Sequence, residues 1–441
     1  MKKYSQLIRH QGNSSLFDII DISILGTLSG VPVHIHAEGL RGTGKTTIIR
    51  ASKGILPKIE RIRGCLYNCD PKKPHCPEHS HLTPAEIEKI GVEIVDMPFL
   101  EISPSAKKGT VVGSIDLKKL SSKEHPEAAL LLGTIPKAHR GIIFVDEINR
   151  IADTSPELAD ILLDVMGTKP GRLQIEEVGL PTVEIPVQVS VWAASNPDED
   201  PGPLEEIRRQ LSDRFDFAVN VERPVDVDYI KRILDEQHLP VDSRSEKEKM
   251  KMLLEAKKII NNFVPAADIH SLLASLYVNF GLESLRGIES ILLGVNLRGA
   301  LLRKTPDIDD VIFVARYALR HRTDAKTLND ILKSLEQSKS LQEKSLKATK
   351  PLPEDESTKT STSRRAGENK KMASRKMQDK FFNGFEQLLS RLKNGFKSKS
   401  KNPSPRSIDP KDVEIKAPPQ KALPIKELDI TEYVKTEEEL G

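Results

Sequence analysis

Residues 39–47 read GLRGTGKTT and have the types and spacing of a phosphate-binding loop. They match the Walker A pattern G-x-x-x-x-G-K-[ST], in which backbone N–H groups surround the phosphates, the lysine reaches the β- and γ-phosphates and the hydroxyl binds Mg²⁺. The sequence therefore predicts a site for ATP and Mg²⁺. The residues expected to bind the nucleotide are Gly39, Gly42, Gly44, Lys45, Thr46 and Thr47, with Thr46 also a ligand of Mg²⁺.

Two adjacent carboxylates close the apolar run GIIFVDEIN at residues 141–149. The end of a buried strand is where a P-loop enzyme needs one carboxylate near Mg²⁺ and another that activates water. We expect Asp146 to hold the nucleotide-associated Mg²⁺ and Glu147 to act as the general base, as in a Walker B motif.

Three further polar residues are candidates for catalysis at the γ-phosphate. Asn196 ends the run VQVSVWAASN at residues 187–196, where its amide can orient the attacking water. Arg214 lies in LSDRFDF and Arg286 in SLRGIES, and a guanidinium group neutralises charge on a transferring phosphoryl group. The predicted catalytic set is Glu147, Asn196, Arg214 and Arg286.

All three cysteines of the chain lie in one short segment that also contains histidines. The pattern C-x3-C-x6-C-x2-H has the spacing of a structural zinc site, and an odd number of cysteines argues against a disulfide framework. The four candidate ligands are Cys65, Cys69, Cys76 and His79. His75 and His81 are alternatives for the fourth ligand, and free thiols in an ordinary loop are the alternative to a metal. An iron–sulfur cluster is less favoured with three thiolates.

The elements around these motifs predict an α/β fold with a parallel sheet. Residues 31–38, 141–149 and 187–196 have the pattern of strands, and residues 46–57 have helical spacing. Strands separated by helical stretches indicate βαβ units, which bind ligands at the carboxyl ends of their strands. Residues 171–186 alternate around a glycine and a proline, which predicts a hairpin inserted in the core.

The length of 441 residues suits two packed domains with additional unpacked sequence. Residues 1–223 are expected to form the P-loop core, and residues 224–325, which are helical in pattern, a separate α-helical lid domain. Residues 326–441 are rich in Lys, Ser and Pro and are expected to form a largely disordered tail. Within it, residues 372–396 carry apolar side chains on one helical face and predict an amphipathic docking helix.

Composition excludes several functional classes. The formal net charge of +3 is too small for a dedicated nucleic-acid-binding protein. No apolar run approaches the roughly 20 residues of a membrane span, and the first residues lack the apolar core of a signal peptide. We therefore expect a cytoplasmic protein without a membrane span.

The order of these motifs resembles the ATPase (I) subunit of magnesium chelatase and its relatives among the AAA+ ATPases. The resemblance extends over roughly residues 31–322 and rests on GLRGTGKTT, GCLYNCDP, KAHRGIIFVDEINRI, AASNP, LSDRF and SLRG in that order. It implies that Asn196 is sensor 1, Arg214 the arginine finger acting across a subunit boundary, and Arg286 sensor 2. It also implies ATP hydrolysis in a homo-oligomeric ring, a hexamer. Arg208 and Arg209, which lie close by in the sequence, are the alternative candidates for the arginine finger.

Three functions agree with this resemblance. The first is the motor of a metal chelatase, which drives a large partner subunit to insert a metal ion into a tetrapyrrole. The second is a MoxR-like chaperone that acts with a von Willebrand A domain protein. The third is a nucleic-acid motor related to replicative helicases. Glu176, Glu177 and Glu184 make the predicted hairpin acidic where DNA requires basic residues, which ranks the third last.

Overall fold

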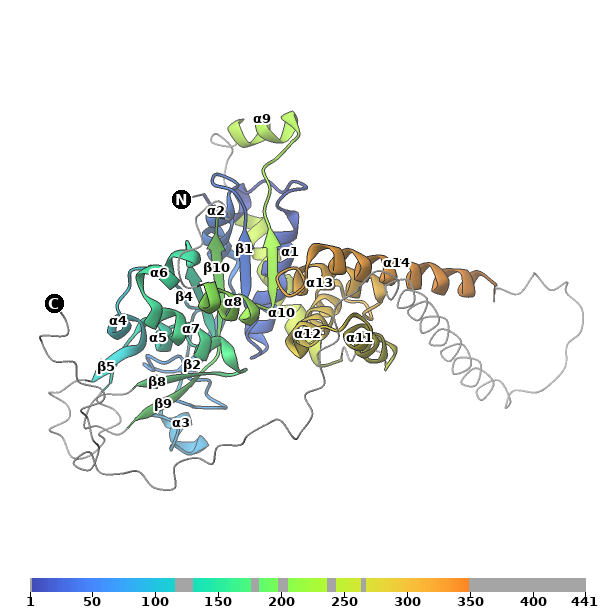
Figure 1. Ribbon diagram of the computed structural model, residues 1–441. Coiled ribbons are helices and arrows are strands. Elements are labelled where there is room, and N and C mark those ends of the chain that lie inside the picture. The colour runs from blue at the N-terminus through green and yellow to red at the C-terminus, as the bar shows by residue number, and fades with distance from the viewer. Residues whose placement is uncertain are drawn as a thin grey trace, which may run out of the picture. The chain divides into compact units, whose positions relative to one another are not determined.

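The computed structural model describes residues 2–115, 130–175, 182–196, 205–235, 243–262 and 267–348. Its centre is a parallel sheet of five strands in the order β11-β1-β10-β7-β4 (Figure 1). The strands are β1 (Ile35–Glu38), β4 (Phe99–Ile102), β7 (Gly141–Val145), β10 (Val189–Ser195) and β11 (Phe217–Asn220). The α/β class and the parallel sheet predicted from the sequence are therefore confirmed.

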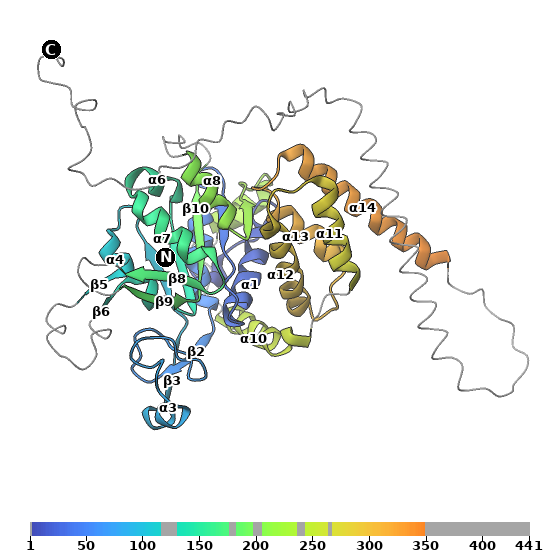
Figure 2. The ribbon, with the colours of Figure 1, turned by 60° about the horizontal axis from the view of Figure 1, so that its bottom comes forward.

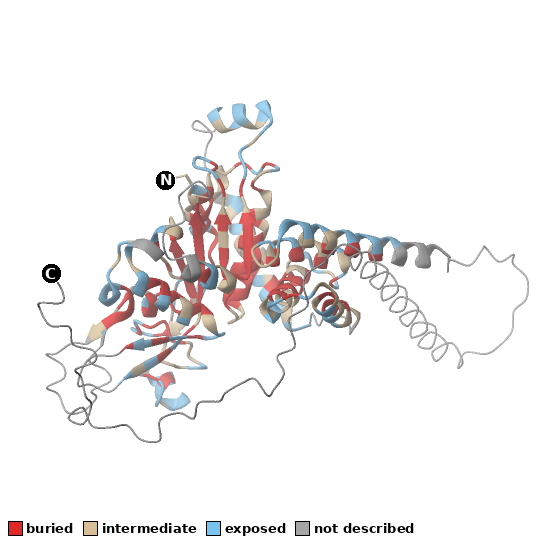
Figure 3. Ribbon diagram, in the orientation of Figure 1, coloured by how far each residue is buried: buried red, intermediate tan, exposed pale blue. Residues whose placement is uncertain are grey.

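Strands β7 and β10, which form within the apolar runs of the sequence, are buried along their whole length. Every residue of β7 and of β10 is buried, as the colouring of Figure 3 shows. Continuous apolar runs are typical of parallel strands that are covered on both faces, because neither set of alternating side chains meets water. The predicted strand pattern of residues 141–149 and 187–196 is confirmed.

Two helices, α1 (Ser14–Leu28) and α7 (Pro156–Gly167), cover opposite faces of β10. Trp192 donates a hydrogen bond from Nε1 to Ser23 Oγ on α1 at 2.8 Å. The neighbouring residue Val191 belongs instead to the apolar cluster that contains Leu162 of α7. Successive side chains of a strand point to opposite faces, so α1 and α7 lie on different sides of the sheet.

Helix α1 is not among the elements predicted from the sequence, although the helix contributes much of the core. Most of its residues are buried, including apolar residues on every side of the helix. A helix buried all round has no polar face, so it lacks the 3.6-residue periodicity by which an amphipathic helix is found.

Three small antiparallel sheets are attached to the core (Figure 2). The first pairs β2 (Lys58–Ile62) with β3 (Val92–Asp96), and α3 (Pro84–Ile90) lies between them in the chain. The second pairs β5 (Gly113–Ile115) with β6 (Leu130–Leu132). The third pairs β8 (Gly171–Ile175) with β9 (Val183–Val187), which confirms the predicted hairpin. Glu184 lies on this hairpin, 3.5 Å from Arg172, whereas Glu176 and Glu177 lie outside the described residues.

The remaining elements of the core are short. The helices are α2 (Lys45–Ala51), α4 (Lys108–Val112), α5 (Thr134–Lys137), α6 (Ile151–Thr154) and α8 (Glu205–Arg214). Among the described residues, the 3₁₀ turns are η1 (Tyr4–Gln6), η2 (Ser52–Ile55), η4 (Ile148–Arg150) and η6 (Ile260–Asn262).

After the sheet the chain is helical, as predicted for residues 224–325. The helices are α9 (Val227–Asp235), α10 (Ser243–Ile259), α11 (Ala267–Phe280), α12 (Leu285–Leu302) and α13 (Ile308–Ala318). Helices α10 and α12 pack against α1, and α13 packs against β11. Across the part of the chain that the structure describes, no helix has the length and apolar character needed to cross a membrane.

The start of the tail differs from the expected boundary after residue 325. Helix α14 (Ala325–Ala348) continues the helical region and packs against α13 and α11. Ile331 and Leu335, one turn apart, are fully buried there. Leu328, Ile331, Leu332 and Leu335 recur at helical spacing, so the pattern favours a helix that the expected boundary left out. Residues 349–441, with the predicted amphipathic helix at 372–396, lie outside the described residues.

A buried arginine joins the C-terminal helices to the sheet. Arg322 donates from Nη2 to the carbonyl oxygens of Asp213 at 2.8 Å and Phe215 at 2.7 Å. Its Nε donates to Asp213 Oδ1 at 3.1 Å, and only 6% of its side chain is exposed. These hydrogen bonds attach the loop after α13 to the segment that leads into β11.

A buried histidine makes the stability of this core sensitive to acid. His34 is fully buried, its Nδ1 accepts a hydrogen bond from the Val191 N–H at 3.1 Å, and burial lowers its pKa to about 3. Below the unfolded pKa of about 6.5 the unfolded chain takes up a proton that folded His34 does not, so stability falls as the pH falls. Between about pH 7.5 and pH 5.5 this loss is about 1.4 kcal/mol.

Urea unfolding at the two pH values, with His34→Asn for comparison, measures this contribution. The asparagine Oδ1 keeps an acceptor for Val191 but does not titrate in this range. We expect the variant to be less stable at neutral pH and to lose about 1.4 kcal/mol less than the wild type on acidification. Equal losses in both proteins would show that His34 does not contribute to the acid sensitivity.

Candidate functional site

The phosphate-binding loop connects β1 to α2 at the carboxyl edge of the sheet. Gly39 has a φ of +154° and lies so close to Val221 that an added Cβ would come within 2.2 Å of the Val221 carbonyl oxygen. Gly42 and Gly44 have φ values of +78° and +87°, in the left-handed region that glycine adopts without strain. At each of these three glycines of the motif, the turn requires a backbone conformation or a close approach that a residue with a Cβ would not accommodate without strain.

This loop forms one wall of a cavity of about 300 Å³. The opposite wall consists of residues at the carboxyl ends of β7 and β10, the two strands next along the sheet from β1. The lining residues are Arg41, Gly42, Gly44, Lys45, Thr46, Thr47, Asp146, Glu147, Ala194, Ser195 and Asn196. Ligands of α/β proteins bind at this edge of the sheet, so the cavity lies where the fold predicts a site.

Lys45 lies between the loop and the end of β10. Its Nζ donates to the carbonyl oxygens of Gly39 at 2.5 Å and Leu40 at 2.9 Å, and to Asn196 Oδ1 at 3.1 Å. The side chain is buried, and these three acceptors are formally uncharged oxygens. Phosphate oxygens are stronger acceptors for an ammonium group than carbonyl oxygens, so this arrangement suits exchange of Lys45 onto an anion.

Asp146 and Glu147 follow β7 directly and line the same cavity. Thr46 Oγ1 donates to Asp146 Oδ1 at 3.2 Å, which places a hydroxyl and a carboxylate oxygen side by side. Glu147 has a φ of +52°, and its Oε2 lies 3.0 Å from Nη1 of Arg150. A left-handed glutamate at a strand end is an unusual backbone state of the kind that clusters at functional sites.

Arg50 was not predicted from the sequence as a site residue, although it contacts Asp146. Its Nη2 is 3.4 Å from Asp146 Oδ2, and its guanidinium donates two hydrogen bonds to one carboxylate oxygen of Glu101. These contacts orient Asp146, so Arg50 is a positioning residue. Arg50 follows the phosphate-binding loop without a motif of its own, and only the pairing of β4 with β7 brings Glu101 close to it.

Arg214 and Arg286, the two predicted catalytic arginines, lie together at the amino ends of the strands, opposite the end that carries the cavity. Strands β1 and β11 are parallel and in register, from Ile35 opposite Phe217 to Glu38 opposite Asn220. The phosphate-binding loop follows the carboxyl end of β1, whereas Arg214 precedes the amino end of β11. A strand of four residues separates these ends by about 10 Å. Within one chain, Arg214 therefore lies away from the cavity.

Arg286 is held in the same place by Asp213. Its Nη1 lies 3.0 Å from Asp213 Oδ2, next to Arg214, whose Nη1 donates to the Gly167 carbonyl oxygen at 3.2 Å. Burial and the charge of Arg286 lower the pKa of Arg214. Among the residues that the structure describes, the lining of the cavity includes neither arginine. The structure thus brings Lys45, Asp146, Glu147 and Asn196 together, and Arg214 with Arg286 apart from them.

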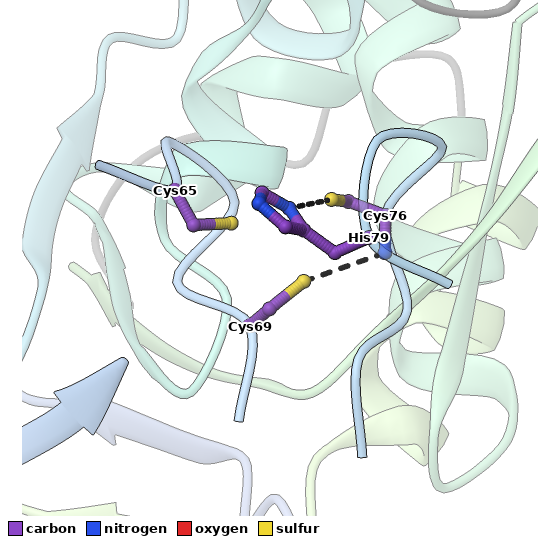
Figure 4. A group of neighbouring side chains, drawn as sticks. All are labelled: Cys65, Cys69, Cys76 and His79. Carbon is purple, nitrogen blue, oxygen red and sulfur yellow. Dashed lines mark hydrogen bonds between the residues drawn. The ribbon is translucent and has the colours of Figure 1, made fainter. Parts of the chain in front are cut away.

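The cysteine segment forms a second candidate site, between β2 and α3. Sulfur atoms of the three cysteines and a ring nitrogen of His79 all lie within 4.8 Å of one another, and all four residues are buried. Figure 4 shows the three thiols and the imidazole converging, with Cys76 Sγ 3.0 Å from His79 Nδ1. Of the three histidines considered from the sequence, it is His79 that lies with the thiols in this group.

The parallel sheet, the loop at its carboxyl edge and the helices that follow define a protein of the AAA+ class. The chain is 30% identical over 330 residues to the magnesium-chelatase 38 kDa subunit of Acidiphilium rubrum, which covers 71% of this chain and 90% of that protein. The chain belongs to the family of the magnesium-chelatase 38 kDa subunit.

Two further proteins are similar to this chain at lower identity. A magnesium-chelatase subunit ChlI homolog of Methanocaldococcus jannaschii is 28% identical over 301 residues, which cover 65% of this chain and 78% of the relative. A complex between subunits BchI and BchD of magnesium chelatase, based on cryo-EM, contains a chain that matches with a TM-score of 0.41 at 26% identity, covering 75% of this chain and 98% of that one. No family model matches the chain.

Proposed function

We propose that this protein hydrolyses ATP with Mg²⁺ as a motor subunit and thereby drives a larger chelatase subunit. One observation carries the proposal: a single cavity combines the phosphate-binding loop, Lys45, the Asp146–Glu147 pair and Asn196. A loop for phosphates could serve binding alone, but an adjacent base and an amide at the far wall are the groups that hydrolysis requires.

The residues around Thr46 suit a magnesium ion. The Thr46 hydroxyl and the Asp146 carboxylate already lie within hydrogen-bonding distance, and hard oxygen ligands of this kind are those that Mg²⁺ prefers. Thr46 and Asp146 would hold the ion, which neutralises charge on the β- and γ-phosphates when bound. Arg50 keeps the Asp146 carboxylate turned toward Thr46.

Hydrolysis then requires a water molecule placed against the γ-phosphate. Glu147 accepts a proton from this water, and the Asn196 amide holds it in line. The hydrogen bond from Lys45 to Asn196 connects this amide to the phosphate-binding loop. Lys45 leaves Asn196 when it binds the phosphates, which frees the amide for water.

Arg214 and Arg286 complete the site of a neighbouring chain. Both lie at the amino edge of the sheet, so a ring that sets this edge against the next chain's cavity delivers their charge to its nucleotide. The ring is a homo-oligomer, which we take to be a hexamer. Its partner is a large chelatase subunit, because relatives of this chain carry the name of magnesium-chelatase subunits.

Steady-state ATP hydrolysis by the purified chain with Mg²⁺ tests this proposal, with and without the large subunit of a magnesium chelatase. Lys45→Ala is expected to lose nucleotide binding and turnover, because the buried ammonium group is removed. Lys53→Ala is the matched control, since Lys53 is an exposed lysine two turns further along the chain.

The outcomes separate the two parts of the proposal. Equal turnover by both variants would disprove the role of Lys45 and with it the assigned site. Stimulation of a fully active ATPase by a von Willebrand A domain protein of a chaperone system, and not by a chelatase subunit, would keep the motor and reassign its client.

A further inference from the structure

We propose that Cys65, Cys69, Cys76 and His79 bind one structural zinc ion. Each residue offers one ligand atom, and the four atoms lie within 4.8 Å of one another. A tetrahedral zinc ion with bonds of about 2.3 Å to sulfur places its sulfur ligands about 3.8 Å apart. A contraction of roughly 1 Å or less therefore closes the site around one ion.

The ligand set identifies the metal and its role. Three thiolates and one imidazole suit zinc, whereas calcium and magnesium prefer oxygen ligands. A cluster of several iron and sulfide atoms requires thiolates that are further apart than these. All four ligands come from the protein and are buried, so no position is open to water or substrate. Closed sites of this kind are structural rather than catalytic.

The surroundings supply the hydrogen-bond donors that a zinc thiolate site requires. The backbone N–H groups of His75 and Cys76 both donate to Cys69 Sγ at 3.4 Å. Three thiolates around a divalent ion leave one net negative charge. Arg140 lies beside the segment: its Nη1 is 3.4 Å from the carbonyl oxygen of Asn68, next to the ligand Cys69, and it forms an ion pair with Asp70 at 3.4 Å. This guanidinium group therefore offsets part of the excess charge.

His75 contacts a ligand of the site and is not itself the fourth ligand. Its Nδ1 lies 3.2 Å from Cys69 Sγ, but its ring stacks on His139 with the centroids 3.6 Å apart. The group of mutually close ligand atoms contains His79 in its place. His81, two residues further along, is exposed.

The site attaches the cysteine segment to the turn that precedes β7. Asn68, which lies between the first two ligands, donates from Nδ2 to the Lys137 carbonyl oxygen at 2.7 Å. Arg140 Nη1 donates to the Glu60 carbonyl oxygen of β2 at 2.5 Å. Zinc thus holds residues 64–79 in the shape that docks on residues 137–140, from which β7 leads to Asp146. Loss of zinc should loosen this segment first.

The experiment measures metal in the full-length chain purified under reducing conditions, without chelators, from cells supplied with zinc. We expect about one zinc per chain and no stoichiometric iron in the wild type, in His81→Ala and in His75→Ala. We expect less than about a tenth of this in Cys69→Ser and in His79→Ala. Zinc retained in His79→Ala, or lost in His81→Ala, would overturn the assigned ligand set.

A second measurement uses the wild type alone, so that misfolding of a variant cannot decide the result. Zinc is removed with a chelator and replaced by cobalt(II), whose visible spectrum reports its geometry and ligands. We expect the bands of tetrahedral cobalt with sulfur-to-metal charge transfer. We also expect faster proteolysis within residues 62–91 of the chelator-treated chain, reversed by zinc. An octahedral cobalt spectrum, stoichiometric iron, or a wild type that binds no zinc would each disprove the site.

Discussion

Replacing Glu147 with glutamine is expected to lower the ATP turnover number by about 10²- to 10⁴-fold, the usual contribution of a general base. Glutamine has the size of glutamate but cannot accept the proton of the attacking water. ATP binding should remain, because Lys45 and the glycines of the loop are unchanged. The variant should therefore retain ATP and Mg²⁺ without hydrolysing them. Phosphate release and binding of radiolabelled ATP measure the two properties separately.

Glu157→Gln is the matched control for this prediction. Glu157 is exposed in the first turn of α7, so the same change of charge is made outside the cavity. Its turnover should equal that of the wild type. Turnover of Glu147→Gln within a few-fold of this control would remove Glu147 from the role of base, and loss of ATP binding would show that its change disturbs the loop.

Arg214→Ala is expected to lower turnover by roughly 10³- to 10⁵-fold, the range measured for arginine fingers. The affected nucleotide belongs to the neighbouring chain, because Arg214 lies at the edge of the sheet opposite its own cavity. A Lys45→Ala chain has the reverse defect, since it presents Arg214 but cannot bind ATP. Each variant should be inactive alone. Mixed rings contain interfaces that pair an intact loop with an intact arginine, so activity should return with the mixing ratio.

The mixing experiment requires that hetero-oligomers form, which two different affinity tags can verify. Arg209→Ala tests the exposed neighbour of Arg214 and should retain most activity if Arg214 is the finger. Wild-type turnover by Arg214→Ala rings would rule out the assignment, as would verified mixed rings that recover no activity. Arg209→Ala rings that are inactive alone and regain activity only when mixed with Lys45→Ala would transfer the role to Arg209.

The parts of the site that could be predicted from the sequence are those encoded by neighbouring residues. The loop of residues 39–47 and the run ending in Asp146 are contiguous, so spacing alone indicates their chemistry. The strands β7 and β10 could be predicted because short, continuous apolar runs bounded by turn signals are typical of strands buried on both faces. That the carboxyl ends of these strands and the phosphate-binding loop lie at one end of the sheet follows from its parallel arrangement.

What the sequence did not provide depends on contacts between distant residues. Glu101 approaches Arg50 only because β4 lies beside β7, and the burial of Ile331 depends on the packing of α14 against α13 and α11. From the sequence spacing alone, three histidines were candidates for the fourth metal ligand. Only the folded segment, in which His75 turns to stack on His139, places His79 with the thiols.

The anchoring of Arg322 has a mechanical consequence for a ring of such chains. A lid that swings over its own nucleotide must detach from the sheet at each cycle. Here detachment would break the hydrogen bonds of Arg322 to Asp213 and Phe215 and separate α13 from β11, against which it packs. The sheet and helices α12 and α13 should therefore rotate as one rigid body. Movement then takes place at the interface between chains, so a conformational change in one chain is transmitted to the neighbouring chain.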